Sequence, residues 1–490
     1  MEEFLKKLEK RFNLIRTENN AFTNETTNDP VLDFFATCGS LRSRSKKDII
    51  DLFRKAWGKD ASLAMKALFY ARDIREGLGE RRTFRIILEW IGNRDALTVL
   101  HNLENIPFYG RWDDLYALFD TSSEHLAADF MNQQFVEDLN SETPSLLGKW
   151  LKSENASSEE TKRLAAKTRK HFNMSPKEYR KSLSLLRKRI GVVEKKMSEN
   201  RWEEINFEEV PSKASLIYKD AFRHHQPDRY EEFMNDVEEG TKKINASDLF
   251  PYEIVRRIFG GDRDHQALSN LWDNLPQYDC TEDNALTVVD TSGSMTHPDK
   301  LPLSIAVSLG LYIAEHNEGY FSNKFITFSE EPKLQNVVSH SIIDRVKNLS
   351  KAEWGHNTNI EKVFQLILST AVDNDIYKDK MPKKVYVISD MEFDGAVIYD
   401  YEKGYKTLFE KIKDRFGRQG YEMPQLVFWN VNARNTQFPV QKDEVGNVLV
   451  SGGSPHIFDM VINSKDLSPY QFMLKALESE RYERVSASGL

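Results

Sequence analysis

Three polar residues at alternate positions, Asp290, Ser292 and Ser294, are the part of this sequence best suited to chemistry. They end the stretch ALTVVDTSGSM, which begins with an apolar run at Ala285. A carboxylate followed by two hydroxyls places hard oxygen ligands on one loop, and such ligands suit Mg²⁺ or a similar divalent cation. Because the apolar run predicts a buried strand, the polar loop should lie at the carboxyl end of that strand, where open α/β sheets bind their ligands.

Two further oxygen donors occur later in the chain in comparable positions. Thr358 directly precedes a helix predicted over 359–372, and Asp390 ends a buried strand predicted over 384–390. If the strands that end in Asp290 and Asp390 run parallel in one sheet, both carboxylates emerge at the same edge. Thr358 at a helix N-terminus can direct its hydroxyl toward that edge, so five oxygen donors would converge on one cation.

This set of residues resembles the von Willebrand factor A fold and its metal-ion-dependent adhesion site (MIDAS). The pattern of that site is D-x-S-x-S, then a threonine, then an aspartate after a hydrophobic strand, and all five positions match. The resemblance implies that Ser292, Ser294 and Thr358 bind the cation directly. It implies that Asp290 and Asp390 act through water or as alternating ligands. A carboxylate from a partner protein could then take an open position on the ion.

The same residues have alternative roles. Asp290 and Ser292 could cap the helix that follows the first strand, and Thr358 or Asn359 could cap the next helix. Ser292 or Ser294 could be a nucleophile, but the G-x-S-x-G elbow is absent. An aspartyl-phosphate site would require a second acid two residues after Asp290, where Ser292 stands. We therefore expect a protein that is not an enzyme.

The segment 281–490 alternates apolar runs with amphipathic stretches. The expected strands are 285–290, 323–328, 384–390 and 425–431. The expected helices are 301–316, 359–372, 405–416 and 469–478. Strand–helix alternation is typical of a doubly wound parallel sheet. We therefore expect a von Willebrand factor A-like α/β domain over residues 281–490.

Residues 1–280 form a second predicted domain, made of successive amphipathic helices. Helical spacing of apolar residues is clear over 48–57, 61–74 and 82–91, and Gly77-Leu-Gly79 breaks it. Short helices with polar breaks are typical of an α-solenoid or of irregular, HEAT-like repeats. No fixed repeat length is evident in the sequence.

The segment 162–201 is strongly basic. It contains 14 Lys and Arg residues against three Glu, in a chain whose net charge is −8. Lysine and arginine neutralise phosphates without reading sequence, and His171 or Tyr179 could stack on bases. A solvated helical face is the alternative interpretation, with the acidic tract 231–239 as a candidate counterpart within the chain.

Composition places the chain among soluble intracellular proteins. Its 490 residues are enough for two to four domains, and its hydrophobic fraction of 40% is ordinary. The two cysteines, Cys38 and Cys280, form no CxxC pair, which argues against structural zinc and predicts a reducing compartment. The richest apolar segment, 304–314, is about half as long as a membrane span. We expect a cytoplasmic monomer without membrane association, in the host cytoplasm if the source is viral.

Three segments of the helical part, Asn28–Phe35, Ala67–Gly77 and Gly110–Leu115, resemble a group of poorly characterised viral and cellular proteins with this layout. The layout resembles the Ro autoantigen family, in which a ring of helical repeats, the TROVE module, is closed by a von Willebrand factor A domain. The resemblance covers the whole chain in order. It implies a ribonucleoprotein component that binds small structured or misfolded RNA, or RNA with a single-stranded end, through a basic helical ring. A role in RNA quality control would follow.

RNA contacts are expected within the basic segment. The candidate residues are Lys167, Arg169, Lys170, His171, Arg180, Lys181, Arg187, Lys188 and Arg189. The alternative hypothesis is a metal-dependent adaptor or scaffold without RNA, in which the cation captures a partner's carboxylate. A third hypothesis is a viral structural component on the same scaffold. The expected cofactor is Mg²⁺ or another divalent cation.

Overall fold

The chain forms two compact units. The computed structural model describes residues 12–277, 284–328, 332–337, 339, 341–350, 359–394, 406–462, 464 and 466–488. One unit contains the residues up to Asp60 together with Ala246–Ser479, and we call it the α/β unit. The other contains Ala61–Asn245 together with the residues from Glu480 onward, and we call it the helical unit. The position expected for the domain boundary, residue 280, therefore lies inside the α/β unit, in a stretch outside the described residues.

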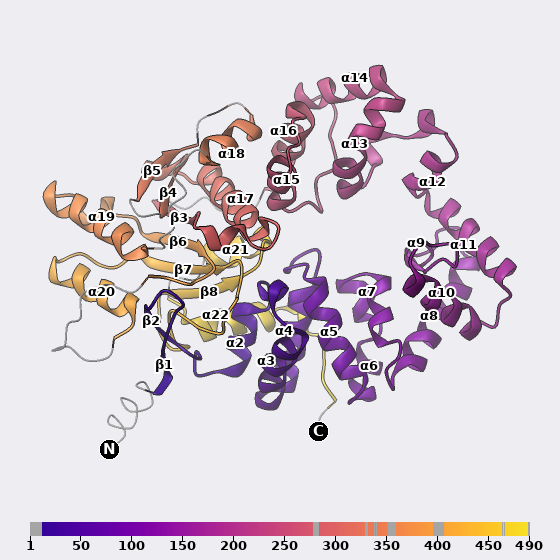
Figure 1. Cartoon of the computed structure of the whole chain (residues 1–490), viewed down its shortest axis with the longest axis horizontal. Coiled ribbons are helices and arrows are strands. Elements are labelled where there is room, and N and C mark those ends of the chain that lie inside the picture. Colours follow the sequence, from indigo (N-terminus) through magenta and orange to yellow (C-terminus); the bar gives the residue numbers. More distant parts are fainter. Residues whose placement is uncertain are drawn as a thin grey trace. The chain divides into compact units, whose positions relative to one another are not determined.

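The α/β unit is built around a six-stranded sheet with the strand order β5-β4-β3-β6-β7-β8 (Figure 1). The strands are β3 (Ala285–Asp290), β4 (Lys324–Phe328), β5 (Lys333–Asn336), β6 (Lys384–Ser389), β7 (Gln425–Asn430) and β8 (Asn447–Ser451). Neighbouring strands are parallel except β4 and β5, which are antiparallel. The four expected strands are confirmed to within one residue, and the short strands β5 and β8 are additions. The fold class is confirmed: a mostly helical N-terminal region precedes an α/β domain.

Helices cover both faces of the sheet because consecutive residues of a strand point to opposite sides. On one face, Leu286 and Val288 of β3 join a core with α19 (Ile360–Asp373) and α20 (Leu408–Arg418). On the other face, Val289 packs against α17 (Leu301–His316) at Gly310. A Cβ atom on Gly310 would lie 2.4 Å from Cγ2 of Val289, so this close approach of helix to strand requires glycine.

The N-terminal residues belong to the α/β unit rather than to the helical part expected from the sequence. The elements involved are β1 (Leu14–Arg16), β2 (Phe22–Asn24), α2 (Pro30–Thr37) and α3 (Lys46–Lys59). The Thr17 hydroxyl donates to the Phe393 carbonyl at 2.7 Å, and the backbone N–H of Gly39 donates to Oγ of Ser451 at 3.0 Å. The unit is completed by α15 (Pro251–Phe259), α16 (His265–Asp273), α18 (Ile342–Ser350), α21 (Phe458–Ile462) and α22 (Pro469–Leu477).

The helical unit is an array of short helices, as expected (Figure 1). They are α4 (Ala61–Arg72), α5 (Arg81–Gly92), α6 (Ala96–Asn102), α7 (Asn105–Tyr109), α8 (Glu124–Asn140), α9 (Leu147–Trp150), α10 (Glu159–His171), α11 (Pro176–Ile190), α12 (Val193–Ser198), α13 (Ser212–His225) and α14 (Pro227–Glu238). The C-terminal residues pack onto it: the Asn102 amide donates to the Ser486 carbonyl at 2.6 Å, and the Tyr482 hydroxyl donates to Asp73 at 3.1 Å. No helix in the described ranges has both the length and the apolar character that a membrane crossing needs.

Buried ion pairs join the segments Ala67–Gly77 and Gly110–Leu115 of the helical unit. Asp114, fully buried, accepts hydrogen bonds from Nε of Arg72 and Nε of Arg85, both at 2.7 Å. A Cβ atom on Gly110 would lie 2.4 Å from Oδ2 of Asp114 and 2.9 Å from Nε of Arg72. Glycine at position 110 therefore leaves room for the ion pair between Arg72 and Asp114. This pair explains why Arg72 and Gly110 stand in the two segments.

Candidate metal centre and basic surface

Four of the five expected metal residues, Asp290, Ser292, Ser294 and Asp390, lie at the point where the strand order of the sheet reverses. From β3, the chain continues to β4 on one side, whereas β6 pairs with β3 on the other side. The carboxyl ends of two such strands leave a crevice between them, which is the usual ligand position in doubly wound folds. Asp290 ends β3 and Asp390 directly follows β6, so the parallel register brings both to this crevice.

Asp290 is fully buried at the crevice. Its Oδ1 accepts the backbone N–H of Ser292 at 2.9 Å, and its Oδ2 accepts the hydroxyl of Ser389 at 2.7 Å. Burial, and then the nearby carboxylate of Asp390, raises the pKa of Asp290 above its usual range. Among the described residues, no lysine, arginine or histidine pairs with Asp290, so its ionised form lacks a countercharge in the protein.

The two serines present their hydroxyls together beside this carboxylate. Oγ of Ser292 lies 3.0 Å from Oγ of Ser294, and Ser292 is buried. Ser294 lies in a short 3₁₀ turn, Gly293–Thr296, that follows the strand. The local chain therefore turns both hydroxyls to one point, as the D-x-S-x-S spacing predicts.

Asp390, unlike Asp290, forms an ion pair with an arginine side chain among the described residues. Its Oδ2 accepts a hydrogen bond from Nη2 of Arg434 at 3.0 Å, and its Oδ1 accepts the N–H of Glu392 at 3.2 Å. Arg434 also donates from Nη1 to Glu18 at 2.6 Å. Ser389 and Arg434 were not predicted, and no local sequence pattern identifies them, because both act across the sheet edge on residues distant in the chain.

The donor set fits a hard cation. Two buried carboxylates and two hydroxyls offer only oxygen, and Asp290 lacks a neutralising partner, so a bound ion would offset the cost of its buried charge. Within the described ranges, no three His, Cys, Asp or Glu side chains gather as a chelate. A cation would therefore depend on the serine hydroxyls as well. Thr358, the fifth predicted ligand, lies outside the described residues.

Arg434 should weaken cation binding, because its guanidinium occupies Asp390 and places a positive charge at the site. Replacing it by glutamine (Arg434→Gln) is expected to raise the affinity for Mn²⁺ by about tenfold, equivalent to about 1.4 kcal/mol. Isothermal titration of Mn²⁺ into the full chain measures this. The control is Arg415→Gln, which removes an arginine that pairs with Glu361 in the same unit. Equal affinities of the wild type and Arg434→Gln would contradict the competition.

The basic segment occupies α10, α11 and α12 of the helical unit, and several of its cations already have acidic partners. Lys167 pairs with Asp120 and Glu124, and Arg169 pairs with Glu154, while His171 forms a hydrogen bond with Asp129. For the described pairs, the counterpart is therefore local rather than the acidic tract 231–239 in α14. These three candidates for RNA contact would have to exchange one anionic partner for another.

Three further residues that were expected to contact RNA, Arg187, Arg189 and Tyr179, instead bind backbone carbonyls within the fold. The guanidinium of Arg187 donates to the carbonyls of Gly148 and Leu151, at 3.1 and 2.9 Å. Arg189 donates to the carbonyls of Leu139 and Ser141. Tyr179 was expected to be able to stack on bases, and this is wrong: its side chain is fully buried and its hydroxyl donates to the Lys152 carbonyl at 2.9 Å.

The remaining cations are exposed and have no acidic partner in the part of the chain that the structure describes. They are Lys170, Lys177, Arg180, Lys181 and Lys188. Four of the five lie on α11, and their side chains are not needed to neutralise or cap the surrounding structure. Among the residues predicted from the sequence, this set is therefore the best candidate for binding an anion.

Comparisons with known proteins find relatives without an assigned activity. Residues 17–119 and 138–279, together half of the chain, match a family described as a domain of unknown function (DUF2828), and residues 284–486 match a second domain of unknown function (DUF7788). The chain is 28% identical over 510 residues to "Uncharacterized protein L728" of Acanthamoeba polyphaga mimivirus, covering 95% of this chain and 87% of that protein. The crystal structure of the Deinococcus radiodurans Ro (RSR) protein aligns with 92% of this chain and 100% of its own, at 13% identity and a TM-score of 0.48.

Proposed function

Because the chain belongs to the family described as a domain of unknown function (DUF2828), whose description assigns no activity, we propose a function from its side-chain chemistry. The protein binds RNA without enzymatic action, through the exposed cations of α10 and α11. It also holds a divalent cation, Mg²⁺ by the hardness of its ligands, at the carboxyl ends of β3 and β6.

One observation carries the RNA proposal: five exposed cations on two successive helices lack acidic partners in the described structure. In a chain of net charge −8, such a surface attracts polyanions locally while the rest of the molecule repels them. Lysine and arginine at helix surfaces contact phosphates rather than base edges, so recognition rests on charge and on the shape of the RNA. The choice of RNA among polyanions follows from the resemblance of the layout to the Ro family.

The salt dependence of RNA binding tests the proposal. If the five cations each neutralise one phosphate of a single strand, the logarithm of affinity falls with the logarithm of salt at a slope of about −3.5. Raising the salt from about 50 to about 200 mM should then weaken binding about 100-fold. Filter binding of a small labelled RNA to the full chain measures the slope. Absent or salt-insensitive binding would contradict the proposal.

The crevice favours a second candidate, a metal-dependent adaptor. A cation held mainly by Ser292, Ser294 and two carboxylates remains electrophilic enough to take an acidic group from a partner protein. Its test is a pull-down with and without Mg²⁺. Capture that requires Mg²⁺ and is lost in Asp290→Ala would favour the adaptor, and RNA binding unaffected by Asp290→Ala would separate the two activities.

A further inference from the structure

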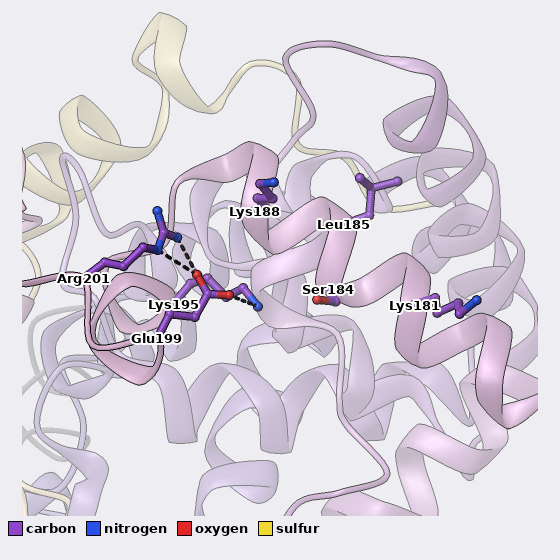
Figure 2. A pocket seen from close by; sticks show the side chains of 7 residues that line it. All are labelled: Lys181, Ser184, Leu185, Lys188, Lys195, Glu199 and Arg201. Carbon is purple, nitrogen blue, oxygen red and sulfur yellow. Dashed lines mark hydrogen bonds and ion pairs between the residues drawn. The ribbon is translucent and has the colours of Figure 1, made fainter. Parts of the chain in front are cut away.

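A groove of about 550 Å³ opens between α11 and the residues of α12 and the turn after it (Figure 2). The residues that line it are Lys181, Ser184, Leu185, Lys188, Lys195, Glu199 and Arg201. Four of these seven side chains are cationic and one is anionic. Figure 2 shows the α11 residues along one wall and the cluster of Lys195, Glu199 and Arg201 at the other. The groove therefore has a strong excess of positive charge at a concave surface.

The cations of the second wall are held by Glu199. Nζ of Lys195 lies 2.7 Å from Oε1 of Glu199, and Nε of Arg201 donates to Oε2 at 2.9 Å (Figure 2). Hydrogen bonds from Lys195 and Arg201 keep the pKa of Glu199 below its usual range, so its carboxylate stays ionised. Arg201 also pairs with Glu204. The second wall is thus fixed in position but largely neutralised.

The first wall is not neutralised. Lys181 and Lys188 are exposed, and no residue in the described ranges forms an ion pair with either. Ser184 follows Lys181 by three residues and precedes Lys188 by four, so all three lie on one face of α11. The two lysines are seven residues apart, which separates them by about 10 Å along the helix.

The fold of α11 does not need these lysines. Ser175 and Glu178 form a capping box at the start of the helix, and Gly191 ends it in the left-handed conformation. Arg187 and Arg189, near the end of the helix, are the cations that tie it to the neighbouring segments, through the carbonyls of Gly148 and Leu139. Lys181 and Lys188 are therefore free to bind a ligand.

We propose that this groove binds two phosphate groups of the RNA backbone, with Lys181 and Lys188 each contacting one phosphate and the Ser184 hydroxyl donating between them. The assignment rests on the proposed RNA-binding function. Lys195 and Arg201, kept in place by Glu199, provide a second cationic rim, and Leu185 gives an apolar surface for a ribose or a base edge. Glu199 reduces the positive charge of the groove, so it opposes the ligand while it orders the rim.

The proposal predicts effects of opposite sign from neighbouring residues. The variant Lys181→Gln/Lys188→Gln should bind inorganic tripolyphosphate at least tenfold more weakly, and its salt slope for single-stranded RNA should be shallower by about 1.4, the contribution of two phosphates. Glu199→Gln should bind tripolyphosphate severalfold more tightly, because one negative charge leaves the groove. Lys170→Gln is the matched control for the groove: Lys170 is exposed and unpaired in the described structure but lies on α10, outside the groove, so tripolyphosphate binding should keep its wild-type affinity. Its salt slope for RNA should be shallower by only about 0.7, the contribution of one phosphate.

The full chain is used, with calorimetric titration of tripolyphosphate and fluorescence anisotropy of a labelled single-stranded RNA. Glutamine retains high helix propensity, so the variants should keep the wild-type melting temperature. The proposal is overturned if the double variant keeps the wild-type salt slope while binding RNA, or if Glu199→Gln binds tripolyphosphate more weakly than the wild type. A wild type that binds tripolyphosphate in the groove but no RNA would overturn the proposed function and leave a phosphate site standing.

Discussion

Replacing Asp114 by alanine is expected to lower the free energy of unfolding of the helical unit by about 3–5 kcal/mol. Asp114 is fully buried and accepts hydrogen bonds from Arg72 and Arg85 at 2.7 Å. Arg72 is itself buried, so removing the carboxylate leaves a guanidinium without its countercharge and without access to water. The loss exceeds that of an ordinary ion pair because the cost is the desolvation of the remaining charge.

Hydrogen exchange measures this effect in the helical unit alone, because amides of α4 and α5 report the opening of the helices that carry Arg72 and Arg85. Glu159→Ala is the control, since Glu159 pairs with Lys162 at the surface and its loss should leave exchange unchanged. Asp114→Asn keeps the shape but removes the charge, so an intermediate loss is expected. Wild-type protection of α4 and α5 in Asp114→Ala would contradict the buried ion pair.

Magnesium at about one thousand times its dissociation constant is expected to raise the free energy of unfolding of the α/β unit by about 4 kcal/mol. The ion would bind the folded state alone, because Asp290 and Asp390 come from separate strands and meet only in the sheet. Asp290→Ala and Ser292→Ala should abolish the gain. Without metal, Asp290→Ala should lower the free energy of unfolding by about 1–3 kcal/mol, because the Ser292 N–H and the Ser389 hydroxyl lose their acceptor.

Calorimetric unfolding with Mg²⁺ and with excess EDTA measures the gain. Ser369→Ala, which removes an exposed serine of α19, is the matched control and should keep it in full. Because a proton competes with the ion for Asp290, the gain is present above the raised pKa and shrinks as the pH falls through it. An undiminished gain in Asp290→Ala would assign the ion to another site.

The residues of the candidate metal centre could be predicted because their information is local. An apolar run that ends in Asp290, and another that ends at Asp390, encode two buried strands whose carboxyl ends meet once the sheet is parallel. Arg434 could not be predicted in the same way. It follows β7, and its contact with Asp390 depends on the order of strands in the sheet, which no neighbouring residue specifies.

For the basic surface too, the sequence predicted one part and the tertiary structure decided the rest. Composition located the positive segment, but contacts with other helices decide which of its cations are free. Tyr179 is an instructive error, because Tyr179, Leu183 and Leu186 follow the i, i+4, i+7 spacing of a buried helical face, and all three are buried. That signal was present in the sequence and outweighs the aromatic character of the side chain.

The sequence by itself determined the fold class, the four main strands, the helical array and the edge at which a cation would bind. These features follow from the spacing of apolar residues along short stretches of the chain, which distinguishes strands from helices. Only the tertiary structure decided that the residues before Asp60 join the α/β unit, that those after Glu480 join the helical unit, and which lysines remain unpaired. These depend on contacts between segments separated by hundreds of residues, such as Thr17 with Phe393. Closely spaced oxygen ligands in the sequence can therefore indicate a metal site. The charged residues that surround the site, such as Arg434 beside Asp390, come from distant segments and are known only from the fold.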